Sequence, residues 1–130
     1  MIYLELPYVT IQWDESIACV AMKWKGFIPG EDFQNGLNKG VELLAAKQGR
    51  KWLSDLSEMA VISQENQAWT DENWFPQAAA TGLRFIAVVK PRKVIPQMSL
   101  QNIINHVGNA DVATAFFDTP EEAWQWLAAR

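Results

Sequence analysis

Residues 84–89 of this chain read Arg-Phe-Ile-Ala-Val-Val (RFIAVV), and Lys90 and Pro91 follow. Phenylalanine, isoleucine and valine favour strands, and a strand that is apolar on both faces is typical of a parallel sheet covered by helices on both sides. Proline cannot donate to a strand ladder, so Pro91 marks the end of the strand. This stretch therefore predicts an α/β fold with a buried central strand.

On either side of this stretch, strand-like and helix-like patterns alternate. Apolar residues recur at every second position in the first strand and at a spacing of three or four in the helices. A short polar turn separates the first two strands, which predicts an antiparallel hairpin. The predicted order is ββαβαβαβα, a single α/β domain over residues 1–130 with a mostly parallel sheet and an N-terminal antiparallel hairpin. The expected strands cover 8–13, 17–24, 51–56, 84–89 and 113–117, and the expected helices cover 33–45, 74–81, 99–107 and 120–127.

Two glycines interrupt the apolar pattern of the first predicted helix. Gly36 and Gly40 lie four residues apart and therefore on one side of that helix. Each costs about 1 kcal/mol relative to alanine in a helix interior. We expect close packing of this side against another element to compensate for the cost.

The bulk composition excludes several classes of protein. Apolar residues make up 49% of the chain, charged residues 20%, and the formal net charge is −4. Binding to phosphate backbones needs a clustered basic surface, so we expect no nucleic-acid partner. Cys19 is the sole cysteine, which rules out an intramolecular disulfide and fits a reducing compartment. No signal-peptide pattern opens the sequence and no apolar run approaches the ~20 residues of a membrane span, so we expect a cytoplasmic protein without a transmembrane segment.

The sequence contains no recognisable catalytic constellation. His106, the sole histidine, falls near the end of a predicted helix, where the helix dipole favours it. Cys19 falls inside an apolar strand and is predicted to be a small buried side chain. One histidine and one cysteine cannot form a zinc site, and the glycine-rich motifs that bind phosphate are missing from the sequence. We therefore expect no enzymatic activity, no metal and no cofactor.

Two features could still mark a binding site. Trp69 and Trp74 flank the polar stretch TDEN within a predicted irregular segment over 57–73. Large aromatics beside a polar loop can wall a pocket or anchor an interface, and they can equally cover the core. Arg92, in a small basic cluster with its neighbours, follows the carboxyl end of the central strand, where open α/β sheets bind ligands. A small-anion site and a solvated basic loop are the alternatives there.

Four stretches of the sequence carry a resemblance to a known family. The stretches are KWLSDLSEMAVIS (51–63), ENQAW (65–69), ENWFPQAAATGLRFIAVVKP (72–91) and FFDTPEEAWQWL (116–127). Together they resemble the small bacterial SpoIIAA-like proteins, which are described as STAS or CRAL-TRIO-like domains, over residues 24–127. The resemblance implies a four- or five-stranded sheet wound as a βα superhelix.

The resemblance implies two alternative functions. STAS domains bind protein partners and are switched by phosphorylation of a serine, whereas CRAL-TRIO domains hold lipids or other small apolar molecules. Asp55-Leu56-Ser57 matches the Asp-Leu-Ser that ends the STAS strand, but the phosphoacceptor position holds Glu65, with Ser63 one turn away. We therefore expect a regulatory or protein-interaction domain without the usual phosphoacceptor serine, and keep binding of an apolar ligand as the alternative. The candidate binding residues are Asp55, Ser57, Met59, Ser63, Glu65, Trp69, Trp74 and Arg92.

Two further expectations concern burial and assembly. Asp55, near the carboxyl end of an inner strand, is predicted to be partly buried and to accept hydrogen bonds from the loop that follows the strand. Small domains with many tryptophans and an edge hairpin often cover exposed apolar surface by pairing, so a homodimer is predicted.

Overall fold

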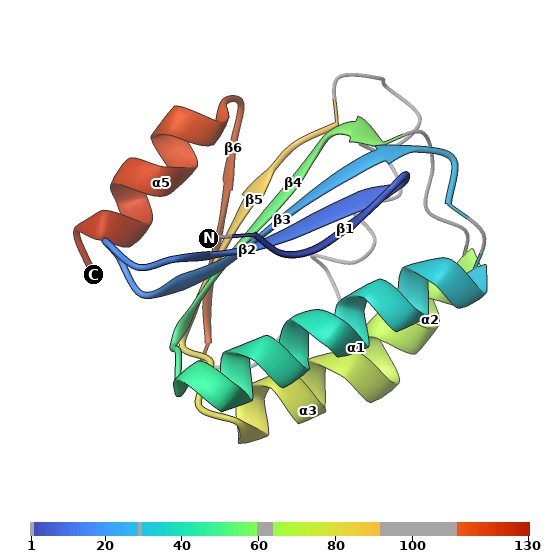
Figure 1. The fold of residues 1–130 in the computed structure, drawn as a ribbon, viewed down its shortest axis with the longest axis horizontal. Helices are drawn as coiled ribbons and strands as arrows, with labels where there is room; N and C mark the ends of the chain where they lie inside the picture. The colour runs from blue at the N-terminus through green and yellow to red at the C-terminus, as the bar shows by residue number, and fades with distance from the viewer. Residues whose placement is uncertain (1, 29, 60–63, 92–111) are drawn as a thin grey trace.

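A six-stranded mixed sheet forms the centre of the computed structural model, which describes residues 2–28, 30–59, 64–91 and 112–130. The strands lie in sequence order from β1 to β6; β1, β2 and β3 pair antiparallel, and β3 to β6 pair parallel (Figure 1). The predicted α/β class, the hairpin and the mostly parallel sheet are therefore confirmed. The strands are β1(Ile2–Leu6), β2(Val9–Asp14), β3(Cys19–Gly26), β4(Lys51–Met59), β5(Phe85–Val89) and β6(Ala113–Phe117). The helices are α1(Gly30–Lys47), α2(Gln64–Trp69), η1(Thr70–Trp74), α3(Phe75–Ala80) and α5(Pro120–Ala128).

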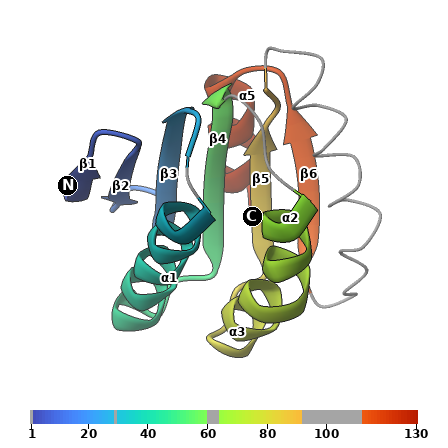
Figure 2. The same ribbon diagram turned by 90° about the vertical axis from the view of Figure 1, so that its right-hand side faces the viewer.

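Helices cover the two faces of the sheet unequally. Among the described helices, α1, α2 and α3 lie on one face, and only α5 lies on the other, against β4, β5 and β6 (Figures 1 and 2). The larger apolar cluster fills the space under α1 to α3, and a smaller one lies under α5. The larger cluster includes Trp24, Leu44, Trp52, Trp74 and Phe75, and the smaller one includes Cys19, Leu53, Val89, Ala123 and Leu127.

The glycines of α1 make room for aromatic rings, as predicted. A Cβ atom on Gly36 would lie 2.6 Å from Cη2 of Trp24, and one on Gly40 would lie 2.3 Å from Cη2 of Trp52. Real Cβ atoms do not approach ring carbons so closely, so the two glycines let α1 rest directly on the tryptophans of β3 and β4. The burial of these rings offsets the low helix propensity of glycine.

The expectation of an irregular polar segment over 57–73 is wrong. Strand β4 continues to Met59, and the chain is helical from Gln64 to Ala80. The polar residues Glu65, Glu72 and Asn73 are exposed on this helix, so the polarity that indicated a loop is the solvent side of a helix. The predicted helix over 99–107 lies outside the described residues.

A π-helical turn explains why the helix does not begin at Trp74, the predicted start of this helix. In an α-helix, proline lacks the N–H that bonds to the residue four positions back, and its ring clashes with that carbonyl. Here η1 precedes the proline, and the N–H of Phe75 bonds to the carbonyl of Thr70, five residues back. Pro76 then occupies the first turn of α3, where its missing donor has no cost.

Strand β1 extends the sheet beyond the predicted hairpin. It pairs with β2 and contains an irregularity between Ile2 and Leu4. Leu4 and Leu6 pack against the larger cluster. Residues 2–6, which precede Pro7, show no clear strand pattern in the sequence. We infer that pairing with β2 stabilises this strand.

The turn between β2 and β3 is tied to α5 through one carboxylate. Asp14 Oδ1 accepts hydrogen bonds from the backbone N–H of Ser16 at 3.0 Å and from its hydroxyl at 2.5 Å, and Oδ2 accepts one from Trp124 Nε1 at 2.8 Å. Partial burial alone would raise the pKa of Asp14, but the hydrogen bonds from Ser16 and Trp124 outweigh it and hold the pKa below its ordinary value. The ionised carboxylate is therefore favoured by the fold.

Asp14→Asn is expected to weaken the dependence of stability on acid pH. Because the pKa of Asp14 is lower in the folded chain, its contribution is complete above the unfolded-state pKa of about 3.8 and is lost as the pH falls through the folded-state pKa. Urea midpoints measured from about pH 6 down to about pH 2 should fall less steeply for Asp14→Asn than for the wild type. Glu121→Gln, which changes an exposed carboxylate of α5, is the control and should keep the wild-type slope. Equal slopes for wild type and Asp14→Asn would contradict the role of Asp14.

Candidate functional site

Polar side chains gather near the carboxyl ends of β3 and β4 on the face that α5 partly covers. The parallel register sets Lys23 opposite Asp55, and Asp55 opposite Val89. Val89 is fully buried in the cluster beneath α5, whereas the Lys23 side chain is exposed. Asp55 therefore lies at the border between the covered and the open part of this face.

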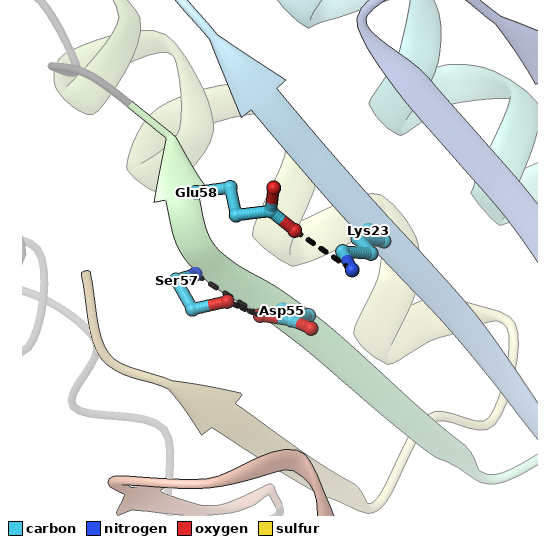
Figure 3. Close-up of polar contacts among 4 residues, drawn as sticks. All are labelled: Lys23, Asp55, Ser57 and Glu58. Carbon is cyan, nitrogen blue, oxygen red and sulfur yellow. Dashed lines mark hydrogen bonds and ion pairs between the residues drawn. The ribbon is translucent and has the colours of Figure 1, made fainter. Parts of the chain in front are cut away.

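Asp55 is buried and bonded to Ser57. Its side chain is 6% exposed, and its Oδ1 accepts hydrogen bonds from the Ser57 backbone N–H at 3.0 Å and from the Ser57 hydroxyl at 2.6 Å (Figure 3). The predicted hydrogen bonds to Asp55 from residues just after it are present, but Asp55 is buried and not partly buried, and the donor lies in β4 and not in a loop. Ser57 belongs to β4 itself and is also buried. The hydrogen bonds between Asp55 and Ser57 link two residues of β4 near its carboxyl end.

An irregularity in β4 places Glu58 on the same face as Asp55. Lys23 pairs with Asp55 and Lys25 with Glu58, so β4 carries one more residue than β3 over this interval. In a regular strand, residues three apart point to opposite faces, and a bulge of one residue reverses this. Glu58 Oε2 then lies 2.7 Å from Lys23 Nζ, as Figure 3 shows. Exposed ion pairs of this kind contribute about 0–1 kcal/mol to stability.

Phe27 adds a large apolar side chain beyond the end of β3. It is 70% exposed, the largest exposed fraction among the exposed large hydrophobic residues of the described chain. Gly26, whose φ of +68° is a conformation that favours glycine, precedes it, and the buried Ile28 follows it. The turn is therefore held on both sides while the Phe27 ring lies in solvent.

The remaining predicted site residues do not join this cluster. Met59 and Trp74 are buried in the larger core, Trp69 is partly buried against it, and Glu65 is exposed in the first turn of α2. Trp74 is therefore a core residue and no part of a loop: its ring centroid lies 5.0 Å from that of Trp52, and its Nε1 donates to the Leu37 carbonyl at 3.3 Å. Ser63 and Arg92 lie outside the described residues.

Sequence reasoning missed Lys23, Phe27 and Glu58. Lys23 is a polar residue in an otherwise apolar strand, and the parallel pairing of β3 with β4 sets it opposite Asp55. The polar residue in an apolar strand, aligned with Asp55, was the signal in the sequence that could have pointed to Lys23. No signal pointed to Glu58, because an extra residue in β4 cannot be recognised from the alternation of apolar and polar residues.

Cys19 is buried as predicted. Its side chain is 1% exposed in the cluster under α5, and burial, with the Asp14 carboxylate as a second cause, raises the pKa of the thiol to about 12. Such a thiol is a poor nucleophile and metal ligand. Within the part of the chain that the structure describes, no three histidine, cysteine, aspartate or glutamate side chains are grouped so that they could hold a metal ion.

A six-stranded mixed sheet with described helices on both faces makes this chain a small α/β domain. Residues 19–128 match the model of the SpoIIAA-like family, so the chain belongs to the SpoIIAA-like family. Its fold is similar to the crystal structure of an uncharacterised protein from the DUF3478 family, with a SpoIIAA-like fold, from Shewanella loihica PV-4. The two chains share 17% identity with a TM-score of 0.62, and the alignment covers 98% of this chain and 99% of that one.

A comparison with curated proteins found no match. Among the described residues, no helix is both long and apolar enough to cross a membrane.

Proposed function

We propose that this chain is a non-enzymatic regulatory or protein-interaction domain of the STAS type, which binds a partner protein at the carboxyl ends of β3 and β4. The observation that carries the proposal is Phe27, 70% exposed, next along the chain to the strand end where Lys25 is set opposite Glu58. An apolar anchor within a rim of charged groups is the usual composition of a protein interface.

The chemistry of the nearby side chains supports binding rather than catalysis. The Ser57 hydroxyl is buried and donates to Asp55, so it is not presented to a substrate. The Cys19 thiol is buried with a raised pKa. Glu65, at the position that the family resemblance gives to the phosphoacceptor, is exposed and carries no hydroxyl. We therefore propose binding that is not switched by phosphorylation at this position.

Photo-cross-linking in the native cells tests the proposal. A benzophenone-bearing phenylalanine in place of Phe27 is expected to give one defined protein adduct, and the same group in place of Arg50, an exposed residue just before β4 at the opposite ends of the strands, is expected to give none. Glu58→Lys should lower the yield of the adduct severalfold. Glu42→Lys is the matched control, because Glu42 is likewise exposed and paired with a lysine, on α1.

Two outcomes would contradict the proposal. One is the same adducts from position 50 as from position 27. The other is no protein adduct at position 27 together with a lipid or other apolar molecule, recovered by solvent extraction in amounts equal to the chain. The second result would favour the apolar-ligand alternative that the family resemblance raised.

A further inference from the structure

Two arginines lie next to each other at the amino ends of β4 and β5. Arg50 comes just before β4, and Arg84 comes just before β5. The backbone N–H groups of Arg84 and Phe85 both donate to the Arg50 carbonyl, at 2.8 and 3.0 Å. Both arginines are exposed. Two cationic side chains therefore start from adjacent backbone positions at one end of the sheet.

No carboxylate of the described chain pairs with either arginine. Within the described ranges, the lysines at positions 23, 39 and 90 form ion pairs, but Arg50 and Arg84 do not. Like charges on adjacent strands repel each other, which is destabilising when no counter-charge lies between them. An anion bound by both side chains would replace this repulsion with attraction.

The Arg84 guanidinium is already held in place. Its Nη1 donates to the carbonyl of Leu83 at 2.7 Å and to that of Ala79, in the last turn of α3, at 3.5 Å. These bonds use one of the three guanidinium nitrogens and leave Nε and Nη2 without a partner in the described chain. The Arg50 side chain forms no hydrogen bond in the same part of the molecule. Because a positioned donor loses less conformational freedom on binding, Arg84 is a prepared half of an anion site.

We propose that Arg50 and Arg84 together bind a phosphate group. Guanidinium groups carry planar forks of N–H donors that match the oxygens of phosphate, and hydrogen bonds between such charged groups are strong. A phosphate monoester carries a charge of about −1.5 to −2 at pH 7, so it can compensate both arginines, whereas a carboxylate compensates only one. The site lies at the opposite end of β4 from the proposed partner surface and does not depend on the proposed function.

Titration of the full chain with inorganic phosphate, followed by NMR of the arginine Nε–Hε signals, tests the inference. The signals of Arg50 and Arg84 are expected to shift together and to reach a plateau, whereas sodium chloride at equal ionic strength should leave them in place. Arg50→Gln should weaken the phosphate affinity measured at Arg84 severalfold. Lys39→Gln, which removes an exposed cation from the middle of α1, is the control and should leave this affinity unchanged. Equal shifts with both salts, or an affinity that Arg50→Gln does not lower, would overturn the inference.

Two further probes distinguish the sources from which the phosphate group could come. A small soluble phosphate ester as the natural ligand predicts that glycerol phosphate reproduces the shifts of Arg50 and Arg84. A lipid headgroup predicts that vesicles of phosphatidylcholine with phosphatidic acid sediment the wild-type chain but not the Arg50→Gln variant. Vesicles of phosphatidylcholine alone are the control and should sediment neither. Failure of both glycerol phosphate and the acidic vesicles to bind would contradict the assignment of a phosphate site.

Discussion

Trp52→Ala is expected to lower the free energy of unfolding by about 3–5 kcal/mol, because it removes a fully buried ring and leaves a cavity. The Trp52 ring lies beneath Gly40 of α1 and meets the ring of Trp74 edge to face. Its Nε1 donates to Ser54 Oγ at 3.2 Å. Since small domains are stable by about 5–15 kcal/mol in total, this loss should move the denaturation midpoint substantially.

Trp69→Ala is the matched comparison and should cost clearly less. Trp69 packs against the same cluster but is only partly buried, so less apolar surface returns to water when it is truncated. Urea denaturation of both variants measures the difference. Equal losses would mean that Trp69 contributes to the core as Trp52 does. A loss below 1 kcal/mol for Trp52→Ala would contradict the described packing of α1 on β4.

Gly40→Ala is expected to destabilise the fold although alanine is the better helix former. The new methyl group would lie 2.3 Å from Cη2 of Trp52 and 2.9 Å from Sδ of Met22. Trp52 is fully buried and cannot swing away, so α1 must shift outward at a cost of about 1–3 kcal/mol. The gain in helix propensity of about 1 kcal/mol offsets only part of that cost.

A double-mutant cycle checks that the clash is with Trp52. Gly40→Ala should cost less in a Trp52→Phe background, because the smaller ring leaves room for the methyl group. Asn38→Ala, at an exposed position of the same helix, is the control and should be neutral or slightly stabilising. If Gly40→Ala raised the denaturation midpoint as a favourable helix substitution would, the close approach of α1 to β4 would be refuted.

The parts of the fold that depend on repeated local patterns could be predicted from the sequence. The stretch from Phe85 to Val89 is apolar on both faces and forms a strand covered on both sides, and Thr119 caps α5 by accepting from the Glu122 N–H. The spacing of Gly36 and Gly40 predicted a close contact, although it could not name the tryptophans involved. These features follow from interactions between residues that are near in sequence or share one periodicity.

The parts that escaped prediction depend on exceptions to those periodicities. The wide turn of η1 carries the helix past Pro76, which an ideal α-helix would not tolerate in its interior. Trp74, at the end of η1, lies in the core, although its neighbours in sequence are polar. The neighbouring polar side chains are on the solvent side, and no local pattern distinguished them from a loop.

The candidate site likewise contains residues that could be placed from the sequence and residues that could not. Asp55 could be placed from its position near the end of an inner strand, and its bonds to Ser57 follow from their spacing of two. Glu58 joins it only because β4 contains an extra residue relative to β3, and Lys23 joins it through the register of two strands far apart in sequence. Exposure of Phe27 is set by the turn that Gly26 makes possible.

The most direct test of the proposed binding surface is amide hydrogen exchange of the chain alone and in complex with the partner that cross-links at position 27. Binding at the carboxyl ends of β3 and β4 predicts slower exchange at the amides of residues 23–28 and 55–58. The amides of residues 48–50, which precede the opposite end of β4, should exchange at unchanged rates. Protection around 48–50 with unchanged exchange at 23–28 and 55–58 would contradict the account and place the partner elsewhere on the molecule.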